Sequence, residues 1–117
     1  MHIFVYGTLK KGNSKHQLLN GSKYLCTTRT TEKYTMIDLG RFPGVLKDEK
    51  TSLSSSSIYG EVYEITPQTL EILDHYEGEW YFREEVDLET GIKSLMYFLK
   101  NVPTVNYEII PNGNWTK

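Results

Sequence analysis

Short stretches of apolar and β-forming residues recur along the chain, separated by glycine, proline and polar turn residues. This pattern is typical of strands joined by turns. Residues 2–6 (His-Ile-Phe-Val-Tyr) predict a central strand that ends at Gly7. Further strands are predicted over residues 22–30, 33–39, 58–65, 81–88 and 92–99, with a hairpin turn at 89–91 between the last two.

One segment carries the signals of a helix. Thr66 is a candidate N-cap, Pro67 suits the first helical position, residues 68–77 form the body, and Gly78 suits the position after the last turn. A chain with many strands and one clear helix predicts an α+β fold with a mixed, strongly curved sheet. The length of 117 residues suits a single domain over residues 1–117.

The remaining segments are predicted as loops and turns. They are a loop over 7–14 followed by a helical turn through 17–19, a turn over 41–44, an exposed mobile loop over the charged and serine-rich residues 47–57, and a tail from Val102 that wraps irregularly over the sheet. We expect no catalytic role for the loop over 47–57.

Composition narrows the classes of partner. The net charge is −2 with acidic and basic residues interspersed, so no basic face favours nucleic acid. The single cysteine, Cys26, cannot form an internal disulfide, and no segment resembles a secretory signal or a membrane span. We therefore expect a cytoplasmic monomer without a membrane partner. His2, His16 and His75 are scattered, so no metal-ligand spacing is present.

A carboxylate falls on the apolar side of the predicted helix. Glu77 is four residues after Leu73 and seven after Leu70, which places it on the same face as both leucines. Burial and the negative end of the helix dipole both raise the pKa of a carboxyl group in this position. A raised pKa suits a general acid/base near neutral pH.

A second interpretation of this helix end stays open. Glu77 would then be exposed in a frayed last turn, or paired with Arg83 or a lysine. Asp74 is expected to orient a neighbouring backbone group or tyrosine rather than to act on a substrate, and Arg83 is expected to form a structural ion pair. Trp80 is placed where its indole narrows or reshapes a pocket next to Glu77.

The turn after the first strand is a candidate anion site. Gly7 allows a ligand to approach the backbone closely, and consecutive amides in such a turn form a nest for a carboxylate or an oxyanion. Thr8 adds a hydroxyl, while Lys10 and Lys11 add positive charge. An ordinary strand-to-loop turn would show the same local pattern.

Five short motifs follow one another along residues 3 to about 99. They are residues 4–12 (Phe-Val-Tyr-Gly-Thr-Leu-Lys-Lys-Gly), 40–43 (Gly-Arg-Phe-Pro), 59–65 (Tyr-Gly-Glu-Val-Tyr-Glu-Ile), 73–78 (Leu-Asp-His-Tyr-Glu-Gly) and 81–83 (Tyr-Phe-Arg). In this order and spacing they resemble the gamma-glutamylcyclotransferase-like superfamily, and are especially similar to its gamma-glutamylamine cyclotransferase branch. The resemblance implies a small, mixed, barrel-like sheet with few helices.

The resemblance also implies an activity. Glu77 would be the acid/base of a lyase that cyclises a γ-glutamyl group to 5-oxoproline and releases an amine, with neither a metal nor an organic cofactor. The substrate-binding residues that it implies are Tyr6, Gly7, Thr8 and Leu9, and we expect Tyr81 to line the same site. The partner is then a small γ-glutamyl compound.

Three other functions are compatible with the chain. One is a binding module that keeps the pocket without turnover. Another is a hydrolase that uses Asp74 and Glu77 as a carboxylate pair, although such pairs usually face each other across a cleft. The last is an interaction protein with a tyrosine-rich surface, which the nine tyrosines support poorly because strands favour tyrosine anyway.

Overall fold

The computed structural model describes residues 1–47, 55–104 and 106–116. Its elements are β1 (His2–Val5), η1 (His16–Leu19), β2 (Lys23–Asp38), β3 (Pro43–Leu46), β4 (Ser56–Glu64), α1 (Pro67–Glu77), η3 (Gly78–Trp80), β5 (Tyr81–Asp87), β6 (Lys93–Leu99) and β7 (Glu108–Ile110). The strands pair in the order β3-β2-β4-β1-β6-β5, and β7 adds to β2. The predicted α+β class is confirmed.

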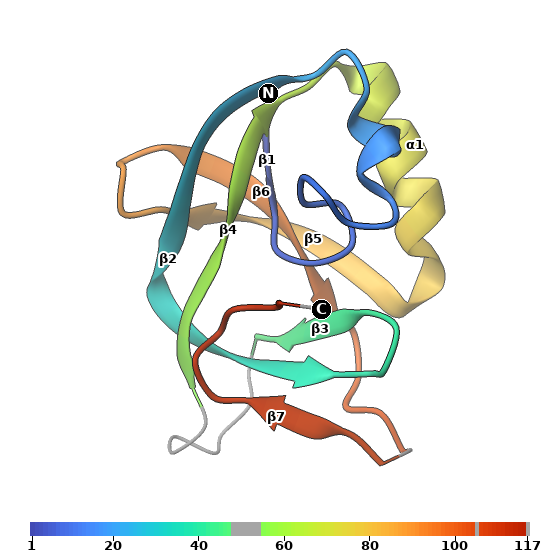
Figure 1. The fold of residues 1–117 in the computed structure, drawn as a ribbon, viewed down its shortest axis with the longest axis vertical. Coiled ribbons are helices and arrows are strands. Elements are labelled where there is room, and N and C mark those ends of the chain that lie inside the picture. Colours follow the sequence, from blue (N-terminus) through green and yellow to red (C-terminus); the bar gives the residue numbers. More distant parts are fainter. Residues whose placement is uncertain (48–54, 105, 117) are drawn as a thin grey trace.

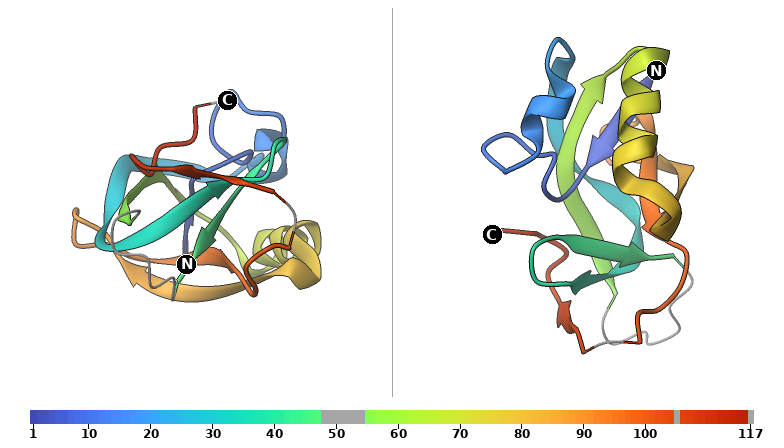
Figure 2. Two further views of the ribbon diagram at one scale, coloured as in Figure 1. Left: turned by 90° about the horizontal axis from the view of Figure 1, so that it is seen from below. Right: turned by 90° about the vertical axis from the view of Figure 1, so that its right-hand side faces the viewer.

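The sheet is mixed and strongly curved, as predicted. The pairing of β1 with β6 is parallel, whereas β1 with β4 and β5 with β6 are antiparallel. In Figure 1, β2 and β4 bend together along one side of the molecule, and β3 and β7 lie across the end remote from the N-terminus. The two turned views in Figure 2 show α1 alongside the sheet rather than across its end.

The strand β1 is central and is buried on both faces. Phe4 contributes to one apolar cluster, with Val62 and Phe98, while Ile3 and Val5 contribute to a second cluster beneath α1. Alternate residues of a strand point to opposite faces, so the apolar run over residues 2–6 reflects a strand covered on both sides. Its predicted position at the centre of the sheet is confirmed.

The helix begins and ends as its sequence predicts. The hydroxyl of Thr66 accepts a hydrogen bond from the Thr69 amide at 3.2 Å, which caps the first turn. Gly78 follows the last turn with a φ of 70°, a backbone angle that favours glycine. Leu70 and Leu73 are buried against the sheet, so the residues on their face of the helix point inward.

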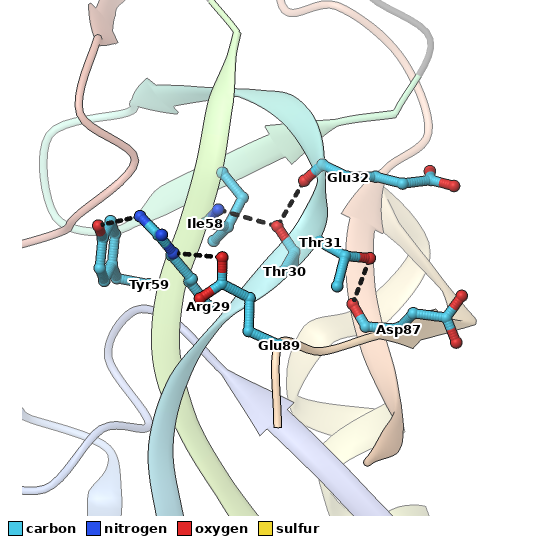
Figure 3. A network of polar contacts seen from close by, with 8 residues as sticks. All are labelled: Arg29, Thr30, Thr31, Glu32, Ile58, Tyr59, Asp87 and Glu89. Carbon is cyan, nitrogen blue, oxygen red and sulfur yellow. Dashed lines mark hydrogen bonds and ion pairs between the residues drawn. The ribbon is translucent and has the colours of Figure 1, made fainter. Parts of the chain in front are cut away.

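The two strands predicted over 22–30 and 33–39 are one long strand, β2. An irregularity in its pairing with β4 falls between Arg29 and Lys33, which is where the sequence pattern breaks. The buried Thr30 hydroxyl donates to the Glu32 carbonyl at 2.7 Å and accepts from the Ile58 amide at 2.9 Å (Figure 3). The strand therefore continues because a side chain replaces the missing ladder bonds.

Other irregular segments also differ from the prediction. The turn over 41–44 leads directly into β3, and residues 56–57 of the predicted loop belong to β4. Residues 48–54 of that loop lie outside the described residues. The tail was expected to be irregular, but β7 pairs with residues 36–38 of β2. Its short apolar run becomes a strand because the free edge of β2 offers it hydrogen-bond partners.

Candidate active site

One pocket of about 280 Å³ lies between α1, the loop after β1 and the turn before β3. Its walls come from parts of the chain that are far apart in sequence. The lining residues are Phe4, Val5, Tyr6, Gly7, Thr8, Leu9, Phe42, Pro43, Tyr76, Glu77, Trp80, Tyr81 and Tyr97. The structure therefore brings together in one cavity the six residues that were expected to be catalytic or to bind the substrate, which are Glu77, Tyr6–Leu9 and Tyr81.

Glu77 is the last residue of α1, and its partly buried side chain faces this cavity. Burial raises the pKa of its carboxyl group to about 7. The carboxylate has no hydrogen bond or ion pair with any other described residue. Since the charged form is poorly solvated and lacks a donor, the carboxyl group can both accept and release a proton near neutral pH.

The alternative interpretation of Glu77, as a residue paired with Arg83, is wrong. Arg83 binds the other carboxylate of the helix, with its Nε 2.9 Å from Asp74 Oδ1 and a second nitrogen 3.1 Å from Oδ2. The Arg83 hydrogen bond holds the pKa of Asp74 below its usual value. The expected structural role of Arg83 is confirmed.

Asp74 orients a tyrosine, as predicted. The Tyr97 hydroxyl donates to Asp74 Oδ1 at 2.6 Å. Asp74 does not line the pocket, whereas Glu77 does. The two carboxylates therefore have different environments: Asp74 is fully paired and remains ionised, and Glu77 is unpaired with a raised pKa. This difference argues against a carboxylate pair acting on one substrate.

Two further tyrosine hydroxyls bond across the pocket wall. Tyr6 donates to the Tyr97 carbonyl at 2.9 Å, and Tyr81 donates to the Pro43 carbonyl at 3.1 Å. Burial, together with the nearby charge of Glu77, raises the pKa of both Tyr6 and Tyr81, so both phenols stay protonated. They form a wall that carries no negative charge.

The loop after β1 is held by its carbonyls, which leaves its amides available. The Gly7 carbonyl accepts from the Lys10 amide at 3.0 Å and from the Asn13 side chain at 2.8 Å. In the described part of the chain, the amides of Gly7, Thr8 and Leu9 have no acceptor. Adjacent unpaired amides at a pocket wall are the arrangement that a carboxylate or an oxyanion would bind.

Gly7 is required by close packing. A Cβ atom at this position would lie 2.7 Å from Pro43 Cγ and 2.8 Å from Cδ, so any larger residue would displace the loop or the turn. The Thr8 hydroxyl is engaged with the Tyr76 hydroxyl at 2.9 Å. The loop is thereby bonded to α1 on one side and packed closely against the first residue of β3 on the other.

The two lysines of the loop do not line the pocket. The Lys10 ammonium donates to the Trp115 carbonyl at 2.6 Å and so ties the loop to the C-terminal tail. Lys11 is exposed. Neither lysine would therefore contact an anionic ligand in the pocket directly.

Several lining residues were not identified from sequence. Phe42 and Pro43 were interpreted only as a turn, and Tyr97 only as part of a strand. The parallel pairing of β1 with β6 brings Tyr97 beside Tyr6, across 91 positions of sequence. No local pattern reports such a contact. A tyrosine inside an otherwise apolar strand was the one available signal, because a buried hydroxyl needs a partner.

Among the described lining residues, Glu77 is the one charged side chain. Within residues 1–47, 55–104 and 106–116, no three His, Cys, Asp or Glu side chains are grouped where they could hold a metal ion. The same ranges contain no helix long and apolar enough to cross a bilayer. The chemistry available in the described pocket is a carboxyl group, backbone amides and neutral hydroxyls.

Fold and pocket together define a class of small α+β proteins in which one buried carboxyl group shares a pocket with unpaired backbone amides, and sequence comparison identifies the family. The family model described as "Gamma-glutamyl cyclotransferase, AIG2-like" matches residues 3–117. The chain belongs to this family.

Individual relatives agree with the family match. A Methanocaldococcus jannaschii protein, MJ1514, is 38% identical over 104 residues, which are 83% of this chain and 82% of that protein. Gamma-glutamylaminecyclotransferase C of Danio rerio is 33% identical over 97 residues, which are 75% of this chain and 62% of its own. A solved structure from Pyrococcus horikoshii aligns with a TM-score of 0.76 at 28% identity, and the alignment covers 97% of this chain and 88% of that one.

Proposed function

We propose that this chain cyclises a γ-glutamyl amine to 5-oxoproline and releases the amine, with Glu77 as the acid/base. The observation that carries the proposal is the Glu77 carboxyl group, which is unpaired among the described residues, has a pKa of about 7, and shares a pocket with the free amides of the loop after β1. Membership of the gamma-glutamyl cyclotransferase family supports the same reaction class.

The reaction begins at the α-amino group of the substrate. Glu77, as a carboxylate, accepts a proton from the α-ammonium, and the freed amine attacks the γ-carbonyl carbon of the same molecule. A new carbon–nitrogen bond closes a five-membered ring and gives a tetrahedral intermediate. Ring closure within one molecule has a high effective molarity, so positioning supplies much of the rate.

The second half of the reaction returns the proton. Glu77, now a carboxylic acid, protonates the leaving nitrogen, the original amide bond breaks, and the oxyanion collapses to the lactam carbonyl. The ring nitrogen then loses its extra proton to the released amine, which leaves as an ammonium ion. A pKa near the working pH allows one group to serve in both directions. No net proton is gained or lost by the enzyme.

The loop after β1 is proposed to hold the negative charge of the substrate. The amides of Gly7, Thr8 and Leu9 are without acceptors in the described chain, and they would donate to the α-carboxylate or to the oxyanion. Tyr6 and Tyr81 are proposed to line the binding site as neutral phenols, because a negative phenolate beside Glu77 would repel both the carboxylate and the substrate.

The leaving group is proposed to be an amine whose atoms next to the amide nitrogen are apolar. Beyond Glu77, the described lining offers no charged group, and Phe42, Pro43 and Trp80 present apolar surface. A γ-glutamyl α-amino acid would place a carboxylate beside these rings without a cation among the lining residues. The likeness to a relative named as a gamma-glutamylaminecyclotransferase supports the same choice.

Product analysis tests the proposal. The purified protein is incubated with γ-glutamyl-ε-lysine, simple γ-glutamyl alkylamines, γ-glutamyl dipeptides and glutathione, and 5-oxoproline is measured. Glu77→Gln should lower kcat by roughly 10³-fold, within the range for loss of an acid/base group. Glu79→Gln, which removes an exposed carboxylate two residues away, is the matched control and should be fully active.

The competing function is a binding module on the same fold. It would give no lactam from any member of the panel, while a γ-glutamyl compound would bind wild type and Glu77→Gln with equal affinity. That pair of results would overturn the enzymatic proposal.

A further inference from the structure

The tyrosine hydroxyls around Glu77 are all engaged elsewhere. Although the carboxylate lies in a pocket with four of these side chains, none of their hydroxyls is bonded to it in the described structure. The bonds are Tyr6 Oη to the Tyr97 carbonyl (2.9 Å), Tyr81 Oη to the Pro43 carbonyl (3.1 Å), Tyr76 Oη with Thr8 Oγ1 (2.9 Å) and Tyr97 Oη to Asp74 Oδ1 (2.6 Å).

The Tyr97 bond differs from the others because its acceptor is charged. Asp74 is fixed by Arg83, whose guanidinium contacts both carboxylate oxygens at 2.9 and 3.1 Å. Tyr97 and Glu77 line the same pocket. Burial raises the pKa of Tyr97 most, followed by the bond to Asp74 and the charges of Asp74 and Glu77. The hydroxyl of a residue that lines the same pocket as Glu77 is therefore bonded to the other carboxylate of the helix, Asp74.

We infer that Asp74 is a positioning residue for the reaction: paired with Arg83, it accepts the Tyr97 hydroxyl hydrogen and so keeps that donor from the Glu77 carboxylate. The inference rests on the proposed function of Glu77 as a base. A donor bonded to a carboxylate stabilises its charged form and weakens it as a base. Asp74 thus preserves the basicity of Glu77 without touching the substrate.

The remaining titratable groups near Glu77 do not compete for this role. The other pocket tyrosines bond to neutral partners, so no charged acceptor controls them. His75 and Glu79 are exposed on either side of Glu77 along the chain, and Arg41 is exposed at the turn that precedes Phe42. His16, on η1, bonds to the Leu9 carbonyl at 2.9 Å.

The test measures Glu77 directly, without a substrate. The protein is labelled at the glutamate side-chain carboxyl with ¹³C, the Glu77 signal is assigned by its loss in Glu77→Gln, and its pKa is read from a pH titration by NMR. The variants are Asp74→Ala, Asp74→Asn, Tyr97→Phe, Arg83→Gln and the double variant Asp74→Ala/Tyr97→Phe. Because the Asp74–Arg83 pair is partly exposed, its loss should be tolerated by the fold.

The variants differ in the pKa that is expected for Glu77. Asp74→Ala frees the Tyr97 hydroxyl and should lower the pKa of Glu77 by about one unit, and adding Tyr97→Phe should restore the wild-type value. Asp74→Asn keeps an acceptor and should leave the pKa unchanged. Arg83→Gln leaves Asp74 to accept as before, so it should not lower the pKa. If the Asp74–Arg83 pair had only a structural role, Asp74→Ala and Arg83→Gln should shift the pKa of Glu77 in the same direction.

Two results would overturn the inference. If the double variant keeps the lowered pKa of Asp74→Ala, added water rather than Tyr97 is responsible. If Tyr97→Phe alone raises the pKa of Glu77, the Tyr97 hydroxyl already donates to Glu77 in the wild type. This single variant tests the inference even if Asp74→Ala fails to fold. Because no step needs turnover, either result is distinguishable from the absence of cyclotransferase activity.

Discussion

Two regions of the molecule bury polar groups, which are paired in one region and unpaired in the other. At the irregularity of β2 (Figure 3), the Thr30 hydroxyl is completely buried and is paired as both donor and acceptor. In the pocket, the Glu77 carboxylate and the amides of the loop after β1 have no partner in the described chain. Since unpaired buried groups cost free energy, the second arrangement fits the use that we propose for the pocket, in which a ligand or a reaction supplies the missing partners.

The contrast also separates the two carboxylates of α1. Asp74 has an arginine and a tyrosine as partners, and its pKa is held low by Arg83. Glu77, one turn later, has neither partner, and burial raises its pKa to about 7. Position on one helix therefore does not decide the chemistry of a carboxylate, because the elements packed against each residue decide it.

The largest effect is expected where the pocket loop is most tightly packed. In Gly7→Ala, the new Cβ would lie 2.7 Å from Pro43 Cγ, so the loop must shift and its amides lose their alignment. We expect a loss of about 10²-fold in kcat/KM for lactam formation. Gly7→Ala/Pro43→Ala removes the conflicting ring atoms and should recover part of the activity. Equal activity of wild type and Gly7→Ala would contradict the proposed role of the loop.

The unpaired state of Glu77 should be visible in stability. Its folded pKa of about 7 exceeds the ordinary value of 4.5, so the folded state loses stability as pH rises from about 4.5 to 7. Relative to Glu77→Gln, the wild type should become less stable by roughly 2–3 kcal/mol between pH 4 and pH 8. Urea unfolding at both values measures this difference. A pH-independent difference would show that Glu77 is solvated or paired.

At the irregularity of β2, where the buried hydroxyl is paired, a substitution should affect stability rather than activity. Thr30→Val keeps the shape of the side chain but leaves the Ile58 amide without its acceptor. We expect a loss of about 1.5 kcal/mol in the free energy of unfolding, with kcat/KM unchanged at a temperature where the variant is folded. Should Thr30→Val retain full stability, the hydroxyl would not be what maintains the irregular strand.

The smallest effect is expected at the mouth of the pocket. Trp80 is 68% exposed and lines the site, so Trp80→Ala should change the preference among leaving amines more than the chemical step. A several-fold rise in KM for alkylamine substrates is expected, with kcat nearly unchanged. Ile72→Ala, which removes another exposed apolar side chain on the same helix region, is the control. An equal change in KM in both variants would exclude a specific contact between Trp80 and the leaving amine.

The parts predicted from sequence are those with local causes. The capped helix, its inward Glu77 and the glycine turn at Gly7 each follow from spacing within a few residues. Tyr97 and Pro43 enter the pocket through strand pairing and packing between remote segments, for which one sequence contains no local signal. The strand β7 was missed for the same reason, because its partner residues on the edge of β2 are 70 or more positions away.

The pH dependence of lactam formation tests the central claim most directly. The initial rate of 5-oxoproline release is measured from pH 4 to pH 9 with the preferred γ-glutamyl amine, and Glu77→Gln is assayed in parallel. If the unpaired Glu77 is the base, kcat/KM falls below a midpoint near pH 7, where its carboxyl group becomes protonated, and Glu77→Gln lacks this transition. A midpoint near the ordinary glutamate value of 4.5, or the same profile in Glu77→Gln, would contradict the account.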